Sequence, residues 1–284
     1  MDRNETEQYE KISQFLYEMN QQPEYHVNYL GRSQERIMTQ LEQHGPDHIA
    51  VLYEGNDIIA VVGIETITDG TAHVFGPITA RTDAATSRRI TALCEQLINK
   101  HPDIKDYEFY ISAQHSFGRL VMKSLRTQYL GTRYTMAATR LNDNAIDTRL
   151  VIPYSPIYKK SFKTLMKNLY INPKERTEEL LELLDKSYEL FILLSEGIVK
   201  GYIVLAANNQ TTCYVDYVVT HKNYRHQGIG HQLVTYAAEH AFKEHEATEI
   251  QLSVEDKRKR TIEFYEKLGF KKVDELHHYK YSVN

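Results

Sequence analysis

Hydrophobic and polar positions follow the same order twice along this chain. In residues 50–65, AVLYEGNDIIAVVGIE, two apolar runs flank a turn that contains Glu-Gly, and residues 191–206, FILLSEGIVKGYIVLA, repeat this arrangement. Two such runs separated by a short turn with glycine predict a β-hairpin. The sequence L-x-E-G occurs in both, at Leu52–Gly55 and at Leu194–Gly197, which indicates an internal repeat.

The segments that follow the two hairpins also match in order. Each hairpin leads to a β-rich run, an amphipathic helix, a strand, a second helix and a terminal β-rich run. The first helix of each set has apolar residues at i, i+3, i+4, i+7 and i+8, the spacing that buries one face of a helix. These residues are Ile90, Leu93, Cys94, Leu97 and Ile98 in the first half, and Leu233, Val234, Ala237, Ala238 and Ala241 in the second.

Two further helices are predicted ahead of each hairpin, at residues 6–20, 33–44, 157–170 and 173–186. Asn172 and Pro173 suit the N-cap and the first position of the last of these helices. The polar segment 142–149 has no periodicity and is the predicted linker. The fold class is therefore α+β, with two domains, 1–145 and 146–284, each a mixed and largely antiparallel sheet flanked by helices.

Composition limits the possible partners. The chain has 284 residues, a formal net charge of −4 and a pI near 6.4, so its overall charge does not attract nucleic acid or an anionic membrane. We find no secretory signal in the N-terminal sequence and no apolar run long enough to cross a bilayer, and we expect a cytoplasmic protein. Cys94 and Cys213 lie in apolar segments and are expected to be buried thiols.

The sequence NYRHQGIGHQL, residues 223–233, follows a β-rich run and opens the second of the two striped helices. Glycines at the start of a helix let backbone N–H groups approach an anion, and Lys222 and Arg225 add positive charge. The pattern is neither G-x-G-x-x-G nor a P-loop. On these residues alone, the stretch is either a phosphate-binding loop or an ordinary tight turn.

Two motifs in order resolve this choice by resemblance. Residues 225–230, R-x-x-G-x-G, resemble the pyrophosphate loop of the GNAT N-acetyltransferase superfamily, and residues 261–273, TIEFYEKLGFKKV, resemble the helix of that family that carries a tyrosine ahead of Gly-Phe. The resemblance is strong over 149–284 and extends weakly to the first half through the repeat. It implies a tandem GNAT protein with a degenerate N-terminal copy.

The resemblance implies a cosubstrate and roles for individual residues. Acetyl-CoA is the expected cosubstrate, and the acceptor is a small-molecule or peptide amine that attacks the thioester directly. Tyr265 is expected to give a proton to the leaving thiolate; alternatively, it is a core aromatic that extends the stripe of Phe264 and Leu268. The pantetheine arm would lie along Val218, Val219 and Thr220, and the pyrophosphate on Arg225, His226, Gln227, Gly228, Ile229 and Gly230.

The amine must lose a proton, and two carboxylates are candidates for the base. Asp216 is the first choice and Glu255 the second, with a chain of water molecules as a third possibility. Arg258 stands where the family often has asparagine. It belongs to the basic run Lys257–Arg260, which either contacts the phosphates of CoA or forms a solvated basic face.

The first copy lacks the features of this site. Its equivalent loop and helix start, ARTDAATSRRI, contain no glycine, and Asp83 adds negative charge there. Alignment of MKSL with YEKL places Met122 where the second copy has its tyrosine. We therefore expect that the first copy does not bind CoA in the ordinary way and has a structural or substrate-shaping role.

Other chemistries find no support in the sequence. His221, His226 and His231 recur every five residues, which does not keep one helical face, and His277 and His278 are adjacent, so no metal site is predicted. The hydrolase sequence G-x-S-x-G is absent. The remaining alternative to an enzyme is a non-catalytic module that binds acyl-CoA. The oligomeric state is open between monomer and homodimer.

Overall fold

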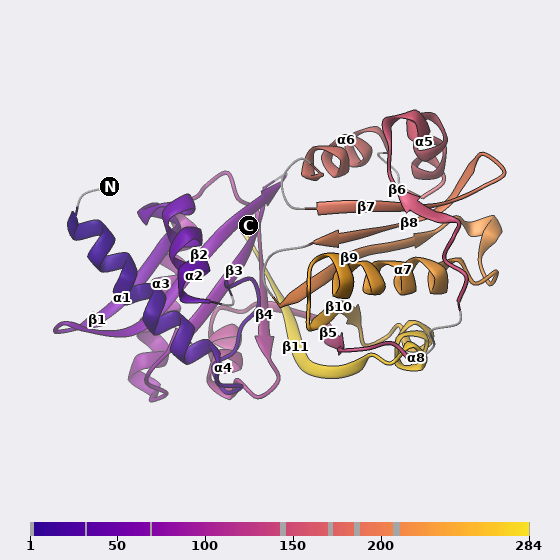
Figure 1. The fold of residues 1–284 in the computed structure, drawn as a ribbon. Helices are drawn as coiled ribbons and strands as arrows, with labels where there is room; N and C mark the ends of the chain where they lie inside the picture. The colour runs from indigo at the N-terminus through magenta and orange to yellow at the C-terminus, as the bar shows by residue number, and fades with distance from the viewer. Residues whose placement is uncertain are drawn as a thin grey trace. The chain divides into compact units, whose positions relative to one another are not determined.

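The computed structural model describes residues 3–31, 33–68, 70–142, 146–169, 173–184, 188–206 and 211–283. The chain forms two compact units (Figure 1): an N-terminal unit, Met1–Arg133 with Asp274–Asn284, and a C-terminal unit, Tyr134–Val273. The division falls before the boundary predicted at residue 145, and the end of the chain belongs to the N-terminal unit. Residues 143–145 at that boundary, and the proposed N-cap Asn172, lie outside the described residues.

The N-terminal unit is a sheet in the order β1-β2-β3-β4-β11 with helices packed on it. Strands β3 and β4 are parallel, and the other neighbouring pairs are antiparallel. The elements are α1 (Arg3–Asn20), α2 (Gln34–His44), η1 (Pro46–His48), β1 (Ile49–Glu54), β2 (Asp57–Thr68), β3 (Thr71–Thr79), α3 (Ala84–Asn99), β4 (Asp106–Ser112), α4 (Ser116–Ser124) and the end of β11 (Lys271–Ser282).

The C-terminal unit repeats this plan in the order β5-β10-β9-β8-β7-β6. Strands β9 and β10 are parallel, whereas the pairs β6–β7, β7–β8 and β8–β9 are antiparallel. The elements are the end of β5 (Gln128–Ala138), β6 (Val151–Pro153), η2 (Pro156–Tyr158), α5 (Lys159–Lys167), α6 (Pro173–Leu183), β7 (Tyr188–Ser195), β8 (Ile198–Ala206), β9 (Thr212–Thr220), η3 (Lys222–Tyr224), α7 (Ile229–Glu244), β10 (Glu249–Glu255) and α8 (Lys259–Leu268). The predicted α+β class is confirmed.

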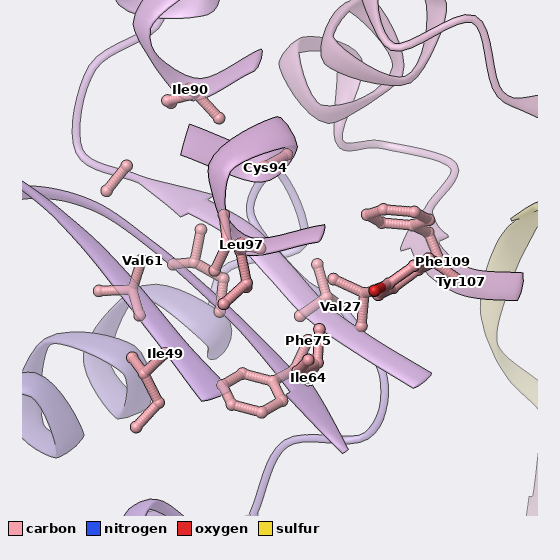
Figure 2. Close-up of a cluster of buried hydrophobic side chains, with 14 of the residues drawn as sticks. Val27, Ile49, Val61, Ile64, Phe75, Ile90, Cys94, Leu97, Tyr107 and Phe109 are labelled. Atoms are coloured by element: carbon pink, nitrogen blue, oxygen red, sulfur yellow. The ribbon is translucent and has the colours of Figure 1, made fainter. Parts of the chain in front are cut away.

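The striped helices bury the faces that their spacing predicts. In α3, Ile90, Cys94 and Leu97 pack over the sheet that carries Val61 and Phe75 (Figure 2). In α7 the whole predicted stripe is buried against β8, β9 and β10. Helices α5 and α6 lie over the other face of that sheet (Figure 1), where a separate cluster of side chains is buried. Burial of one such large aliphatic side chain stabilises the fold by ~1.5–3 kcal/mol, so these stripes fix the helices on the sheets.

Two further predictions concern single features of the chain. Cys94 and Cys213 are free and buried, as expected from their apolar surroundings. Among the described residues, no helix has the length and apolar character that a membrane span requires.

Candidate functional site

The sheet of the C-terminal unit opens between two parallel strands. Strands β9 and β10 are paired from Thr212↔Glu249 to Val215↔Leu252, and the pairing then ends. Beyond that point β9 continues to Thr220 with β8 as its partner, and a β-bulge leaves Asp216 as an extra residue. A bulge bends its strand. Among the residues that the structure describes, no strand pairs with the edge of β9 that faces β10 over its last residues.

A groove of about 650 Å³ lies at this opening. It is formed by the end of β9, the loop that follows, the first turn of α7, and one side chain of α8. Ten residues line it: Val218, Val219, Thr220, Arg225, His226, Gly228, Ile229, Gly230, His231 and Phe264. All but His231 and Phe264 are site residues predicted from sequence, so the fold brings the loop and the strand edge together.

The loop before α7 leaves its backbone donors free. Gly228 is the N-cap of α7 with φ of +74°, a left-handed conformation that glycine adopts without strain. No side chain caps this helix, and within the described chain we find no acceptor for the N–H groups of Gly228, Ile229 and Gly230. His226 also has a positive φ, of 63°. Three free amides at a helix N-terminus, with Arg225 beside them, form a site for an anion.

Gly230 lines the groove, and a side chain at this position would point into it. A Cβ added there would lie 3.7 Å from the ring of Phe264 and 3.9 Å from the hydroxyl of Thr220. These are ordinary contact distances, so the absence of a side chain at this position leaves open the space between α7, α8 and β9. Gln227, which was predicted from the motif, is exposed and does not line the groove.

The two candidate bases differ in their surroundings. Asp216 is an exposed residue, yet the protein atoms around its carboxyl group raise its pKa to about 6, and a hydrogen bond from Tyr188 limits that rise. Glu255 forms ion pairs with Lys257 at 3.0 Å and with Arg258 at 3.5 Å, contacts that lower its pKa. A carboxylate with a raised pKa is the stronger base, and the role of Asp216 as the base remains a prediction. It lies on β9 just before the groove, not in its lining.

Tyr265 lies behind the groove in the core of the C-terminal unit. Its side chain packs edge-on against Phe270, and only 8% of the residue is exposed. Burial raises the pKa of its phenol to about 12, so the group is neutral at physiological pH. No hydrogen bond to this hydroxyl is found in the described chain. The burial of Tyr265 fits a core aromatic, and its place beside Phe264, which lines the groove, fits a proton donor.

Arg258 is the N-cap of α8 and points to a carboxylate rather than to the groove. Its Nε lies 3.5 Å from Oε2 of Glu255, and it is absent from the lining of the groove. Lys257 uses the same carboxylate. Two members of the basic run are thus engaged with Glu255, and contact of Arg258 with CoA remains a prediction.

The N-terminal unit fills the equivalent positions with its own side chains. At the start of α3, Asp83 accepts hydrogen bonds from the N–H groups of Ala85 and Thr86, both at 2.9 Å. His115, the N-cap of α4, is fully buried and contacts the carbonyl of Pro77 on β3 at 3.0 Å. Met122 is also fully buried. The backbone N–H groups at the helix start, which are free in α7, are thus occupied by Asp83 in α3.

Three residues near the site were not predicted. Phe264 and His231 line the groove, and Tyr188 donates to Asp216. Phe264 lies inside the motif 261–273 and His231 directly follows the motif 225–230, so a helical wheel of each helix would have identified them. Tyr188 lies on β7, far from Asp216 in sequence, and no local pattern indicates it.

Comparison with known proteins agrees with this geometry. The family described as Acetyltransferase (GNAT) family matches residues 155–270, which include the whole groove. No curated protein sequence shows significant similarity to the chain.

Solved structures share the fold of the whole chain at low sequence identity. A GCN5-related N-acetyltransferase from Sphaerobacter thermophilus superposes with a TM-score of 0.73 and 12% identity, covering 98% of this chain and 93% of that one. A tandem GNAT protein from the clavulanic acid biosynthesis pathway has a TM-score of 0.69 and 13% identity, with coverage of 100% and 96%. A putative acetyltransferase from Pyrococcus horikoshii has a TM-score of 0.60 and 12% identity, with coverage of 98% and 87%.

Proposed function

We propose that the protein transfers an acetyl group from acetyl-CoA to a primary amine, because residues 155–270 match the acetyltransferase (GNAT) family. The observation that carries the proposal is the groove at the start of α7, where three free backbone N–H groups adjoin a strand edge without a partner. An ordinary tight turn needs neither feature. A cofactor that has a pyrophosphate and an amide-rich arm uses both.

The groove suits the two parts of the CoA molecule. The N–H groups of Gly228, Ile229 and Gly230 would hold the pyrophosphate, with Arg225 adding charge. The backbone of Val218–Thr220 would exchange hydrogen bonds with the amides of the pantetheine arm, as an added strand does. When bound, acetyl-CoA supplies an acyl group on a thiolate leaving group.

The reaction requires one proton to be removed and one to be provided. The amine nitrogen forms a bond with the thioester carbonyl carbon, and the carbon–sulfur bond then breaks. Asp216 accepts the proton that the amine loses, because a carboxyl group with a pKa of about 6 is ionised at neutral pH. The neutral phenol of Tyr265 gives its proton to the sulfur as the carbon–sulfur bond breaks, so the products are the amide and the free thiol of CoA. The proton taken up by Asp216 then returns through solvent to the phenolate, which restores both groups.

A paired assay separates this proposal from its rival, a non-catalytic module that binds acyl-CoA. Calorimetric titration of the full-length protein with acetyl-CoA measures binding, and release of free thiol in the presence of a panel of small-molecule and peptide amines measures transfer. The proposal expects both signals. Binding without thiol release for any amine would favour the binding module, whereas absence of binding would contradict the assignment of the groove.

Several predictions from the sequence accompany this proposal. The acceptor class, a small-molecule or peptide amine, rests on the family resemblance alone. A cytoplasmic location and a monomeric or homodimeric state also remain predictions. Light scattering on the purified protein measures the last of these directly.

A further inference from the structure

A second cluster of polar side chains lies at the other end of α7. Glu189 on β7 meets His240 in the last turns of α7 and His245, which is its C-cap. Nε2 of His240 is 3.2 Å and Nε2 of His245 is 2.7 Å from the same carboxylate. We propose that these three residues form a binding site for a divalent transition-metal ion, with Zn²⁺ as the best-suited ion.

The spacing of the three donor atoms fits a metal ion. One ligand atom from each residue can be chosen so that all three lie within 4.8 Å of one another. Zinc binds imidazole nitrogen and carboxylate oxygen at ~2.0–2.2 Å, which places tetrahedral donors ~3.3–3.5 Å apart. The contact of 3.2 Å already matches this separation, and the contact of 2.7 Å needs to widen by only ~0.6–0.8 Å.

The donor set selects the class of metal. Two imidazole nitrogens and one carboxylate oxygen suit zinc and its transition-metal neighbours, whereas Ca²⁺ and Mg²⁺ prefer oxygen ligands. The side chains of Glu189, His240 and His245 are 37%, 21% and 31% exposed, so an ion can enter and a water molecule can complete its coordination. On binding, each imidazole is neutral with its proton on Nδ1, any proton on Nε2 having moved to Nδ1 or to solvent, and Nε2 presents its lone pair to the metal.

Neighbouring side chains hold the cluster in place. The ring of His240 meets the buried ring of Phe191 edge-on at 4.8 Å and stacks parallel to Tyr236. Phe191 lies two residues after Glu189 on β7, so both residues meet α7 from the same side of the strand. The carbonyl groups at the C-terminus of α7 also favour a positive charge at this end of the helix. The site is therefore partly organised without the ion.

The cluster is separate from the groove that we assign to CoA. His240 lies eleven positions after Ile229 on α7, which corresponds to ~17 Å along the helix. An ion at this position does not reach the reacting atoms. The ion would connect β7 to the C-terminal end of α7, and the free amides lie at the N-terminal end of the same helix. We therefore assign the ion a structural role. Glu189 is 51 and 56 positions from His240 and His245, so no local motif groups the three residues, and the prediction of no metal site did not include them.

The test is titration of the metal-depleted, full-length protein with ZnCl₂ by calorimetry. We expect one ion per chain, and Glu189→Gln and His240→Gln are each expected to weaken binding at least 10-fold. His101→Gln is the matched control, because His101 lies beside His48 in another histidine cluster, with ring centroids 4.6 Å apart. That substitution should leave the affinity unchanged. Affinity for acetyl-CoA serves as the check that each variant keeps its fold.

Two results would overturn the proposal. One is a wild-type protein that binds no Zn²⁺, and the other is Zn²⁺ binding of equal strength in the wild type and in both Glu189→Gln and His240→Gln. Either would leave the cluster as a hydrogen-bonded His-Glu-His network. If a substitution unfolds the chain, Co²⁺ replaces the variants as the probe. Cobalt held by imidazole at low coordination number absorbs visible light more strongly than hydrated Co²⁺, and an unchanged spectrum would contradict the site.

Discussion

The helices α3 and α7 occupy the same place in the two units, but a side chain caps the N-terminus of α3 and none caps that of α7. At the start of α3, the carboxylate of Asp83 accepts hydrogen bonds from two backbone N–H groups and from the hydroxyl of Thr86. At the start of α7, the N-cap Gly228 has no side chain, and no side chain caps the helix, so the first backbone N–H groups are free. A helix N-terminus thus binds either its own chain or an external anion. The N-cap residue decides which.

The opening between the parallel strands shows the same contrast. In both units the parallel pairing stops after four pairs, at Val74↔Phe109 and at Val215↔Leu252. The N-cap of the next helix is His115 in the first unit, where its ring reaches the carbonyl of Pro77. In the second unit the N-cap is Arg258, which pairs with Glu255 instead. The first copy therefore keeps the split in the sheet and loses the site, because its own side chains occupy the donors and acceptors.

The strongest test of this comparison gives α7 the cap that α3 has. Gly228→Asp should reduce affinity for acetyl-CoA about 1000-fold, because a carboxylate at the N-cap competes for about two charge-assisted hydrogen bonds of ~2 kcal/mol each. Calorimetry measures the change. Gly197→Asp is the matched control, since Gly197 has the same φ of +74° and open space but lies in a hairpin turn. Near wild-type affinity in Gly228→Asp would show that the free amides do not bind the cofactor.

The next test concerns the bulged residue of β9. Counting from the first pairs of the parallel strands, Asp216 corresponds to Phe75, a buried core residue of the first unit. Asp216→Asn should lower kcat/KM by about 100-fold with little change in affinity for acetyl-CoA, because it removes a general base. Glu255→Gln serves as the comparison. A larger loss in Glu255→Gln than in Asp216→Asn would reverse the assignment of the base.

The pH dependence provides an independent check on Asp216. Its pKa is raised to about 6, and only the ionised form accepts a proton. The value of kcat/KM should therefore be low in acid, rise as pH increases through about 6, and level off above it. Asp216→Asn should remove this rise. If kcat/KM for acetyl-CoA, measured for the wild type at saturating acceptor, stays constant between pH 5 and 8, Asp216 is not the base.

A smaller effect is expected at Tyr265, the counterpart of Met122. Tyr265→Phe removes one hydroxyl and keeps the packing against Phe270, so kcat should fall about 10-fold while affinity for acetyl-CoA is unchanged. Tyr236→Phe, which removes a hydroxyl from the side of α7, is the control. Unchanged turnover in Tyr265→Phe would leave the residue as a core aromatic.

The smallest effect is expected in the first copy. Asp83→Ala should lower the melting temperature slightly, because two N–H groups lose their cap, and should leave one acetyl-CoA bound per chain. The hydrogen bond from Thr86 holds the pKa of Asp83 below its usual range. The stabilisation is therefore present above the pKa of the unfolded state and disappears as pH falls through the folded pKa. Binding of a second acetyl-CoA by Asp83→Ala would show that this cap alone closes the site.

The sequence by itself determined the features that depend on nearby residues. The apolar stripes of α3 and α7, the hairpins and the glycine at the start of α7 follow from periodicity and turn chemistry over a few positions. The loop and the strand edge were assigned from two motifs, and eight of those predicted residues meet in the groove. The exposed Gln227 and the ion-paired Arg258 do not line it, since a motif does not specify where each side chain points.

Only the tertiary structure decided the features that join distant segments. The last strand of the chain belongs to the N-terminal unit, where it pairs with β4 from Ser112↔Leu276 to Asp106↔Ser282. The contact of His115 with Pro77 spans 38 positions, and that of Glu189 with His245 spans 56. Such contacts depend on how strands align in a sheet and on where a helix ends over it. Local periodicity does not indicate either of these. The N-cap residue of each helix, Asp83 in α3 and Gly228 in α7, can instead be identified from the sequence.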